Sequence, residues 1–395
     1  MKLHHMCYLC VAILTSFACK RTNHDIAAFQ SAYMNIKKKY APDKRVVLFD
    51  IKPSLINNRL FLKGETTSKK GIAILLDSLK QQNISFTNGI RILPDSAVGN
   101  TTIALGRNSV INMRSAPKHS AELGTQGLLG MELKVLDKKG DWYRVQTPDQ
   151  YISWVDKGGI QLLTPEALEN WQQRDKLIYT KNTGFVYAKK EETSSVVSDI
   201  VFGGMLALIK EHKDFYEVAY PDQRMGYLKK SEAELYTDWL KNNSPNSASI
   251  ERAAKSMLGV PYLWGGTSTK GNDCSGFTKT VYLMNGFVIP RDASQQIHAG
   301  TVVDETLTFK NLEKGDLLFF GTPAKEDKKE RVTHVGIWLG NQKGEFIHSS
   351  GNVHLSSIHE DQKHFDAFNK NRYLGSRRYL DIRDSKIISL KESLR

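Results

Sequence analysis

The sequence predicts an α+β chain built from several small domains, and three observations support this prediction. The chain has 395 residues, which is too long for a single ordinary core. From Thr101 to about residue 238 it alternates short extended runs with Gly, Pro, Asn and Asp, as small all-β barrels do. A polar, Gly-rich loop then leads into a helical run at 276–283, and apolar extended runs follow at 317–320, 332–339 and 345–350.

Residues 1–19 are typical of an export signal. Lys2 gives a positive start, and the apolar run at 6–18 is too short to span a membrane. The run ends in a segment that resembles a bacterial lipobox, although Ser16 replaces the usual leucine. The resemblance implies that Cys19 is lipidated and that the protein is a membrane-anchored lipoprotein of the bacterial cell envelope, in the periplasm or at the cell surface. Simple cleavage and a secreted product are the alternative.

The composition is that of a folded, soluble protein, with 40% hydrophobic and 25% charged residues. Against 42 Asp and Glu there are 55 Lys and Arg, which gives a formal charge of +13. This excess either serves solubility alone or attracts anionic polymers such as cell-wall material. No zinc-ligand spacing, basic helix or RNA-binding signature stands out, so we expect no nucleic-acid partner. We also expect a monomer that requires no metal and no cofactor.

Cys274 is the one cysteine outside the predicted signal, because Cys7, Cys10 and Cys19 lie within it or at its end. An unpaired cysteine in an exported protein has no disulfide role, and we interpret it as a reactive thiol. It stands at the start of a helix, where free N–H groups and the helix dipole favour an anion. We therefore expect a lowered pKa and a nucleophilic thiolate. A buried structural cysteine is the alternative, which its polar neighbours disfavour.

Residues 24–102 are expected to form a small mixed α/β N-terminal domain in which we identify no chemistry. We interpret it as a packing or spacer module. Helical spacing predicts two helices, at 25–40 and 71–82. Extended patterns predict three strands, at 45–51, 59–63 and 84–93.

An internal repeat follows at 103–163 and 176–238. Each copy contains an apolar strand, a turn, an aromatic-rich strand, a second turn and a strand with Gly, Trp or Tyr. The pair resembles bacterial SH3-like domains, which commonly accompany cell-wall enzymes. We assign Trp142, Trp154 and Tyr216 mainly to the barrel cores.

Two histidines in predicted strands are the candidate partners of the thiol. His334 lies in an otherwise apolar strand, where a polar group needs a partner, and His348 lies in the next strand. The turn at 341–344 predicts a hairpin that brings the two rings side by side, within about 5 Å. Nucleophilic catalysis requires a thiol, a base and a group that orients the base. We assign these roles to Cys274, His334 and His348, with an oxyanion site at the Cys274 N–H that Tyr262 assists.

Six motifs occur in order within residues 246–382. They are YxWGG at 262–266, DCSGF at 273–277, PRD at 290–292, GDL at 315–317, HVG at 334–336 and the late His348. Together they resemble the NlpC-type family of bacterial cell-wall cysteine peptidases. The resemblance implies a papain-like α+β catalytic domain at 246–382, preceded by the two small all-β SH3-like barrels.

The resemblance also implies hydrolysis of murein stem peptides between γ-D-glutamate and a diamino acid such as diaminopimelate. Relatives with this pair of SH3-like domains commonly require a free N-terminal L-alanine, as in recycled murein peptides. By analogy the substrate subsites are lined by Trp264, Asp273, Ser275, Arg291 and Asp292. Ala293 stands where relatives often have a small hydroxyl residue, which leaves one subsite contact without its usual side chain.

Two of these assignments have alternatives. In relatives an acidic residue on a loop above the active site recognises the free amine of the substrate. Glu122, at the end of the polar loop 114–122, is the nearest match, and the alternative is a solvated loop charge. Arg291 and Asp292 either bind a zwitterionic peptide or form a structural ion pair.

Three other functions are weighed against this one. The first is another activity on the same fold, either an amidase that cuts the lactyl–L-alanine bond or an acyltransferase. A cell-wall binding protein with a vestigial catalytic domain is the second, disfavoured because Cys274, His334 and His348 are all present. A zinc site made of these three residues is the third, for which no fourth ligand is evident.

Overall fold

A computed structural model describes residues 24–57 and 59–392. The predicted signal and the lipidation site at Cys19 lie outside these residues. The chain divides into two compact units, one reaching Gly99 and including Leu136–Lys138, the other comprising Asn100–Val135 and Lys139–Arg395. Within the described ranges, no helix has the length and apolar character needed to cross a membrane.

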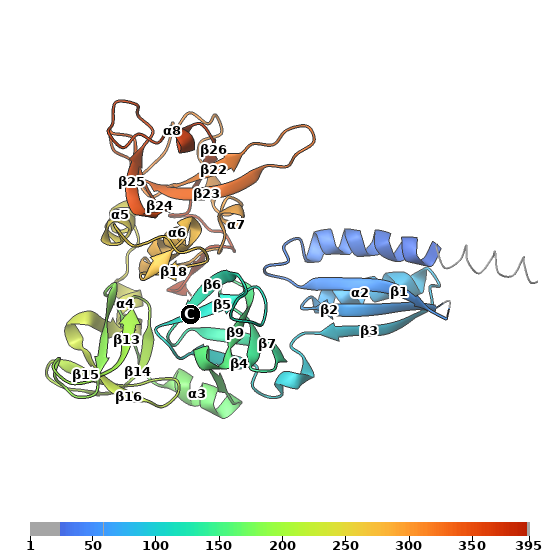
Figure 1. Cartoon of the computed structure of the whole chain (residues 1–395), viewed down its shortest axis with the longest axis horizontal. Coiled ribbons are helices and arrows are strands. Elements are labelled where there is room, and N and C mark those ends of the chain that lie inside the picture. Colours follow the sequence, from blue (N-terminus) through green and yellow to red (C-terminus); the bar gives the residue numbers. More distant parts are fainter. Residues whose placement is uncertain (1–23, 58, 393–395) are drawn as a thin grey trace, which may run out of the picture. The chain divides into compact units, whose positions relative to one another are not determined.

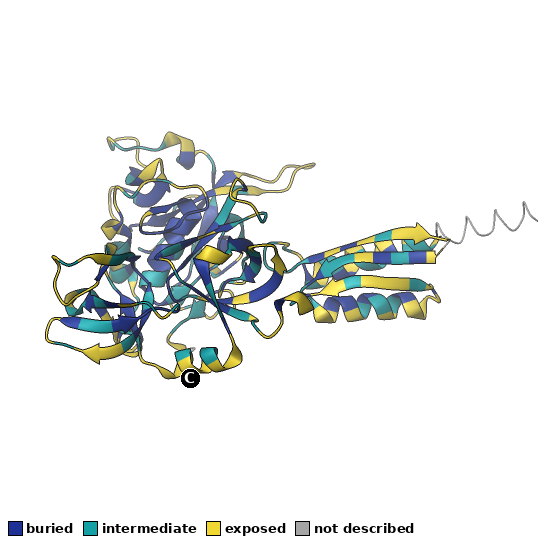
Figure 2. Ribbon diagram, turned by 60° about the horizontal axis from the view of Figure 1, so that its bottom comes forward, coloured by how far each residue is buried: buried dark blue, intermediate teal, exposed yellow. Residues whose placement is uncertain are grey.

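The first unit is a three-stranded sheet with two helices (Figure 1). A helix covers residues 24–40, β1 (Phe49–Ile56) and β2 (Arg59–Thr66) form an antiparallel hairpin, and α2 (Lys69–Gln81) leads to β3 (Phe86–Ile92), which is parallel to β2. The helices bury one side in a core shared with the sheet and expose the other (Figure 2).

The number and type of these elements agree with the sequence prediction, but the first strand begins later than expected. Residues 44–47 form a turn instead of the start of a strand, because the N–H groups of Val46 and Val47 donate to the carbonyl of Asp43. The sequence predicts a strand here because the two consecutive valines are residues typical of strands.

The two repeats fold with the same topology, which confirms the internal repeat. Across the sheet of the first copy the strands lie in the order β10-β4-β7-β8-β9-β5-β6, and across that of the second copy in the order β17-β11-β14-β15-β16-β12-β13, so each strand has its counterpart seven numbers later. Trp154 is buried in the first barrel, whereas Trp142 and Tyr216 are only partly buried. The strands are β4 (Ile103–Gly106), β5 (Val110–Arg114), β6 (Leu123–Leu128), β7 (Glu132–Lys139), β8 (Trp142–Gln146), β9 (Ile152–Asp156) and β10 (Ile160–Leu163), then β11 (Lys176–Tyr179), β12 (Thr183–Tyr187), β13 (Val196–Val201), β14 (Met205–Glu211), β15 (Phe215–Ala219), β16 (Met225–Lys229) and β17 (Ala233–Leu235).

Short helices connect the parts of the second unit. α3 (Pro165–Gln173) lies between the barrels, and α4 (Tyr236–Asn242) leads to α5 (Ser247–Ser256). The cap of α5 is Asn246, whose side chain accepts from the Ser249 N–H while the Ser249 hydroxyl accepts from the Asn246 N–H. Ser247 and Ser249 also suit an N-cap by residue type, but the reciprocal bonding selects Asn246, so α5 begins at Ser247.

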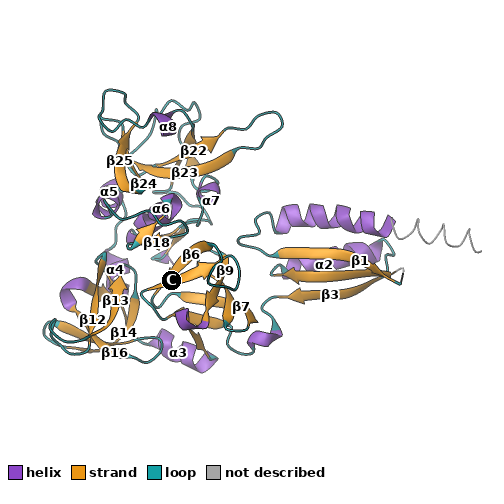
Figure 3. Cartoon of the chain, viewed as in Figure 1, coloured by secondary structure: helices purple, strands orange, loops and turns teal. Residues whose placement is uncertain are grey.

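The C-terminal part is built on a six-stranded antiparallel sheet of order β21-β26-β22-β23-β24-β25, against which α6 (Cys274–Met284) packs (Figure 3). Helices thus lie beside the sheet rather than alternating with its strands, in agreement with the predicted α+β class. The remaining elements are β18 (Thr267–Ser268), β19 (Gly271–Asn272), β20 (Phe287–Val288), α7 (Ala293–Gln296), β21 (Thr301–Val302), β22 (Leu317–Thr322), β23 (Arg331–Trp338), β24 (Glu345–Ser350), β25 (Asn352–Ser357), α8 (Ala367–Lys370), β26 (Tyr373–Arg378) and β27 (Ile388–Ser389).

Candidate active site

Cys274 is the first residue of α6, and Asp273 caps this helix. One carboxylate oxygen of Asp273 accepts from the Gly276 N–H at 2.7 Å, and the other accepts from the Gly265 N–H at 2.9 Å. A single side chain therefore fixes the Gly-rich loop to the helix start. Gly276 is required here, since a Cβ atom would lie 1.9 Å from the carbonyl oxygen of Gly266.

Arg291 supports this cap from the interior of the domain. Its guanidinium donates to the two oxygens of Asp273 at 3.1 and 2.6 Å and to the Ser275 hydroxyl at 3.0 Å. Arg291 is only 1% exposed, and Asp292 lies 3.8 Å from it. The ion pair considered for Arg291 and Asp292 is therefore made chiefly with Asp273. Arg291 faces no solvent, so the structure places it behind the site rather than on its surface.

Burial raises the pKa of the Cys274 thiol to about 12, and the charge of Asp273 acts in the same direction. The N–H groups of Val335 and Ser275 and the charge of Arg291 lower the pKa by less. The expected lowered pKa is thus wrong for the resting site. The helix N-terminus does face the thiol, but the loss of water outweighs it.

His334 on β23 and His348 on β24 are in direct contact. Nε2 of His334 and Nδ1 of His348 lie 2.7 Å apart, and the ring centroids are 4.9 Å apart. The two strands pair antiparallel, Ile337 opposite Ile347, which confirms the predicted hairpin. Nε2 of His348 in turn lies 2.9 Å from the hydroxyl of Ser356 on β25. Three buried side chains from three adjacent strands form one hydrogen-bonded row.

Burial lowers the pKa of His334 to about 3 and that of His348 to about 2. The charges of Arg372 and His354 lower the pKa values of both histidines further. Both imidazoles are therefore neutral at physiological pH. The resting site holds a neutral thiol and two neutral histidines.

Tyr262 and Trp264 lie on the loop before α6. Burial raises the pKa of the Tyr262 phenol, and the negative charge of Asp273, like that of Cys274 when it is ionised, acts in the same direction, so the phenol stays protonated. Trp264 is 62% exposed, and its indole N–H donates to the carboxylate of Glu122 at 2.7 Å. Glu122, which the sequence could place only on a loop, thus reaches the rim of the catalytic loop.

The first barrel is attached to the catalytic domain through buried polar contacts. Gln126 and Thr267 exchange three hydrogen bonds of 3.0 to 3.2 Å, two of them through backbone N–H groups. Nearby, the Lys279 ammonium on α6 lies 3.0 Å from Asp149. Buried polar groups need such partners, so the loop that carries Glu122 is fixed relative to Cys274.

The structure therefore brings together Cys274 with its neighbours Asp273, Ser275 and Tyr262, and separately pairs His334 with His348. The functional candidates that the sequence did not reveal are Ser356, Gln126 and Thr267. All three are polar residues in strands, and only the three-dimensional fold gives them their partners. Among residues 24–57 and 59–392, no three His, Cys, Asp or Glu side chains are grouped so as to hold a metal ion.

Comparison with known proteins gives the following similarities. Residues 259–372 match the NlpC/P60 family, and residues 113–160 match the bacterial dipeptidyl-peptidase Sh3 domain. The chain is 34% identical over 236 residues to a γ-D-glutamyl-L-lysine dipeptidyl-peptidase of Bacillus cereus, covering 58% of this chain and 67% of that protein. It is 31% identical over 233 residues to the Bacillus subtilis protein of the same name, covering 57% and 71%.

Two solved structures share the fold. A Bacillus cereus NlpC/P60 family protein aligns with a TM-score of 0.60 and 27% identity, covering 70% of this chain and 99% of that one. An NlpC/P60 endopeptidase of Photobacterium damselae subsp. piscicida aligns with a TM-score of 0.51 and 13% identity, covering 84% and 77%. At 13% identity the second likeness concerns the fold alone.

Proposed function

Because the chain belongs to the NlpC/P60 family of peptidases, we propose that it is a peptidoglycan endopeptidase that cuts murein stem peptides between γ-D-glutamate and the diamino acid. The observation that carries this proposal is the buried Cys274 at the start of α6, with the hydrogen-bonded pair His334–His348 on the sheet that α6 packs against. The names of the two Bacillus relatives support the bond assignment.

The proposed mechanism starts from the neutral site. The distances allow two proton arrangements, and only one leaves Nδ1 of His334 free to act as a base. In that arrangement His334 donates from Nε2 to His348, and His348 donates from Nε2 to Ser356. Cys274 then transfers its proton to Nδ1 of His334 as the sulfur attacks the γ-carbonyl carbon.

The tetrahedral intermediate collapses when the C–N bond breaks. His334 returns the proton to the leaving amine of the diamino acid, and a thioester with γ-D-glutamate remains on Cys274. Water, deprotonated by His334, hydrolyses the thioester. The Cys274 N–H and the protonated Tyr262 hydroxyl are the proposed donors to the oxyanion.

We propose that Glu122 binds the free N-terminal amine of L-alanine. It lies on the loop fixed above the catalytic domain, and its present partner is the exposed indole of Trp264. A neutral indole donor leaves the negative charge of Glu122 uncompensated, so an ammonium group is a stronger partner. Asp273 and Ser275 are held by Arg291, and we propose that Asp292 faces the substrate. The Cys19 anchor and a place in the cell envelope belong to the same proposal.

Mass spectrometry of L-Ala-γ-D-Glu-diaminopimelate incubated with wild type and with Cys274→Ala tests the proposal. We expect L-Ala-D-Glu from wild type only. Release of the free-amine peptide L-Ala-γ-D-Glu-diaminopimelate from a muramyl tripeptide, without further cleavage of that peptide, would assign the amidase alternative instead. Intact peptides with both folded proteins would contradict cleavage of the free tripeptide and favour either intact-wall substrates or the cell-wall binding alternative.

The Glu122 assignment has its own test. Glu122→Gln keeps the shape of the side chain and removes its charge. We expect a KM for the free tripeptide at least tenfold higher and a KM for the N-acetylated tripeptide that does not change. Equal effects on both peptides would remove Glu122 from amine recognition.

A further inference from the structure

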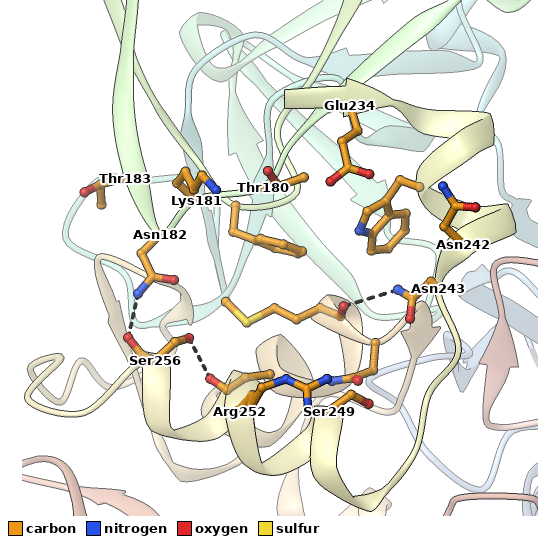
Figure 4. Close-up of a pocket in the computed structure, with 15 residues that line it drawn as sticks. Thr180, Lys181, Asn182, Thr183, Glu234, Asn242, Asn243, Ser249, Arg252 and Ser256 are labelled. Atoms are coloured by element: carbon orange, nitrogen blue, oxygen red, sulfur yellow. Dashed lines mark hydrogen bonds between the residues drawn. The ribbon is translucent and has the colours of Figure 1, made fainter. Parts of the chain in front are cut away.

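Figure 4 shows a polar cavity of about 750 Å³. Because Met284, the last residue of α6, belongs to its lining, the cavity lies at the end of α6 opposite to Cys274. Its walls come from the loop at 180–183 of the second barrel, from α4 and from α5, and Met284 and Asn285 belong to its lining. A helix rises 1.5 Å per residue, so α6 alone separates this cavity from Cys274 by roughly 15 Å. The cavity has the size of a small-molecule site and is distinct from the catalytic one.

Most of the lining consists of groups that both donate and accept hydrogen bonds. Such amides and hydroxyls suit a ligand that is itself rich in hydroxyl and amide groups. An apolar patch of Phe202, Trp239 and Met284 lies among them. The amides and hydroxyls of the lining are Asn182, Asn242, Asn243, Asn285, Thr180, Thr183, Ser249 and Ser256.

The walls are held in place by the protein itself. The Asn182 amide on the barrel donates to the carbonyl of Ser256 on α5 at 2.6 Å, and the Asn243 amide donates to the carbonyl of Met284 at 3.3 Å (Figure 4). The rings of Phe202 and Trp239 pack edge to face, with centroids 6.3 Å apart. The cavity is thus formed before any ligand binds.

Three polar side chains of the lining have no partner. In the part of the chain that the structure describes, the side chains of Arg252, Lys181 and Asn242 make no hydrogen bond and no ion pair. Arg252 and Lys181 carry two positive charges against the single negative charge of Glu234. The cavity therefore offers cationic donors for a carboxylate beside neutral donors and acceptors.

We propose that this cavity binds peptidoglycan glycan from which the stem peptides have been removed, that is, N-acetylated amino sugars with free lactyl carboxylates. Arg252 and Lys181 hold the carboxylate, the asparagines and hydroxyls bond the sugar hydroxyl and acetamido groups, and the apolar patch contacts the C–H faces of the rings. The inference rests on the proposed function. Hydrolysis of the lactyl–L-alanine amide adds water across one bond and yields this carboxylate together with the free-amine peptide, so an amidase supplies ligands to both sites.

The test is isothermal titration of the full chain with three probes: a peptide-free tetrasaccharide that contains N-acetylmuramic acid, the neutral tetramer of N-acetylglucosamine, and L-Ala-D-Glu. We expect the carboxylated tetrasaccharide to bind at least tenfold more tightly than the neutral one. Arg252→Gln should remove this preference and leave tripeptide cleavage unchanged. Arg174→Gln is the matched control, because Arg174 is exposed and lies outside the cavity lining.

Each outcome separates the two proposals. The glycan site is overturned if the tetrasaccharide does not bind. It is also overturned if Arg252→Gln and Arg174→Gln weaken binding equally, because nonspecific attraction to the basic chain then explains the binding. Glycan binding that depends on Arg252, in a protein that does not cleave the tripeptide, supports the glycan site and contradicts the endopeptidase instead.

Discussion

The buried histidine pair makes the stability of the catalytic domain depend on pH in a defined direction. Burial lowers the pKa of His334 to about 3 and of His348 to about 2, whereas both have pKa values near 6.5 in the unfolded chain. Between pH 6.5 and about 3 the unfolded chain binds protons that the folded domain does not, so stability is complete above pH 6.5 and falls as the pH drops. Linkage gives a loss of about 2 kcal/mol per histidine between pH 7 and pH 5, hence about 4 kcal/mol for the pair.

Native-state hydrogen exchange of the β23 and β24 amides measures this loss, after correction for the intrinsic exchange rates. We expect the opening free energy to fall by about 4 kcal/mol in wild type between pH 7 and pH 5, and by far less in the double variant His334→Gln/His348→Gln. The exposed His298→Gln is the matched control and should behave as wild type. If wild type and the double variant lose stability equally, the histidines are not the cause and the reasoning is refuted.

Three more predictions concern the groups around the thiol. Ser356→Ala removes the acceptor of His348 and should lower kcat about tenfold at unchanged KM, with an altered pH–rate profile, whereas Ser356→Thr should retain activity. A kcat of Ser356→Ala equal to that of wild type would exclude the positioning role. Arg291→Gln leaves Asp273 buried without its cation and should cost about 3–5 kcal/mol in urea unfolding, more than Arg291→Lys does; a loss below 1 kcal/mol would contradict the ion-pair argument. The rate of Cys274 alkylation by iodoacetamide should rise throughout pH 7 to 9, and a plateau at pH 7 would reveal a preformed thiolate.

The sequence predicted those features that local patterns determine. The hairpin of β23 and β24 follows from two apolar runs around a turn, and the twofold barrel follows from a repeated strand pattern. Where several neighbouring residues suit the same role, a local pattern does not decide between them. Asn246, Ser247 and Ser249 are all good caps, and only reciprocal bonding selects Asn246. The segment after residue 382 has the polar, basic composition typical of a solvated end, yet β27 within it pairs with β20.

Contacts between distant parts of the chain could not be predicted in this way. The partners of Gln126 and Arg291 are 141 and 18 residues away, and no spacing rule connects such positions. Ser356 has no sequence signal, because a serine in a strand is ordinary until a histidine on the next strand needs an acceptor. The sequence indicated the residues that we propose for catalysis, whereas the groups that orient them depend on the fold.

The thiol shows how the fold reverses a local rule. A helix N-terminus alone favours the thiolate, but burial and the capping carboxylate of Asp273 favour the thiol. A protonated, buried sulfur is a poor target for oxidants, since the thiolate is the reactive form. Protection of this kind suits Cys274, the one cysteine outside the predicted signal, in a protein that we propose to be exported. In the proposed mechanism this burial also gives His334 and its oriented partners their role. The nucleophile forms there only when His334 accepts the proton, and the developing charge then moves to the substrate oxygen rather than staying on sulfur. We therefore propose that the same burial that keeps the thiol inert makes the histidine row indispensable for catalysis.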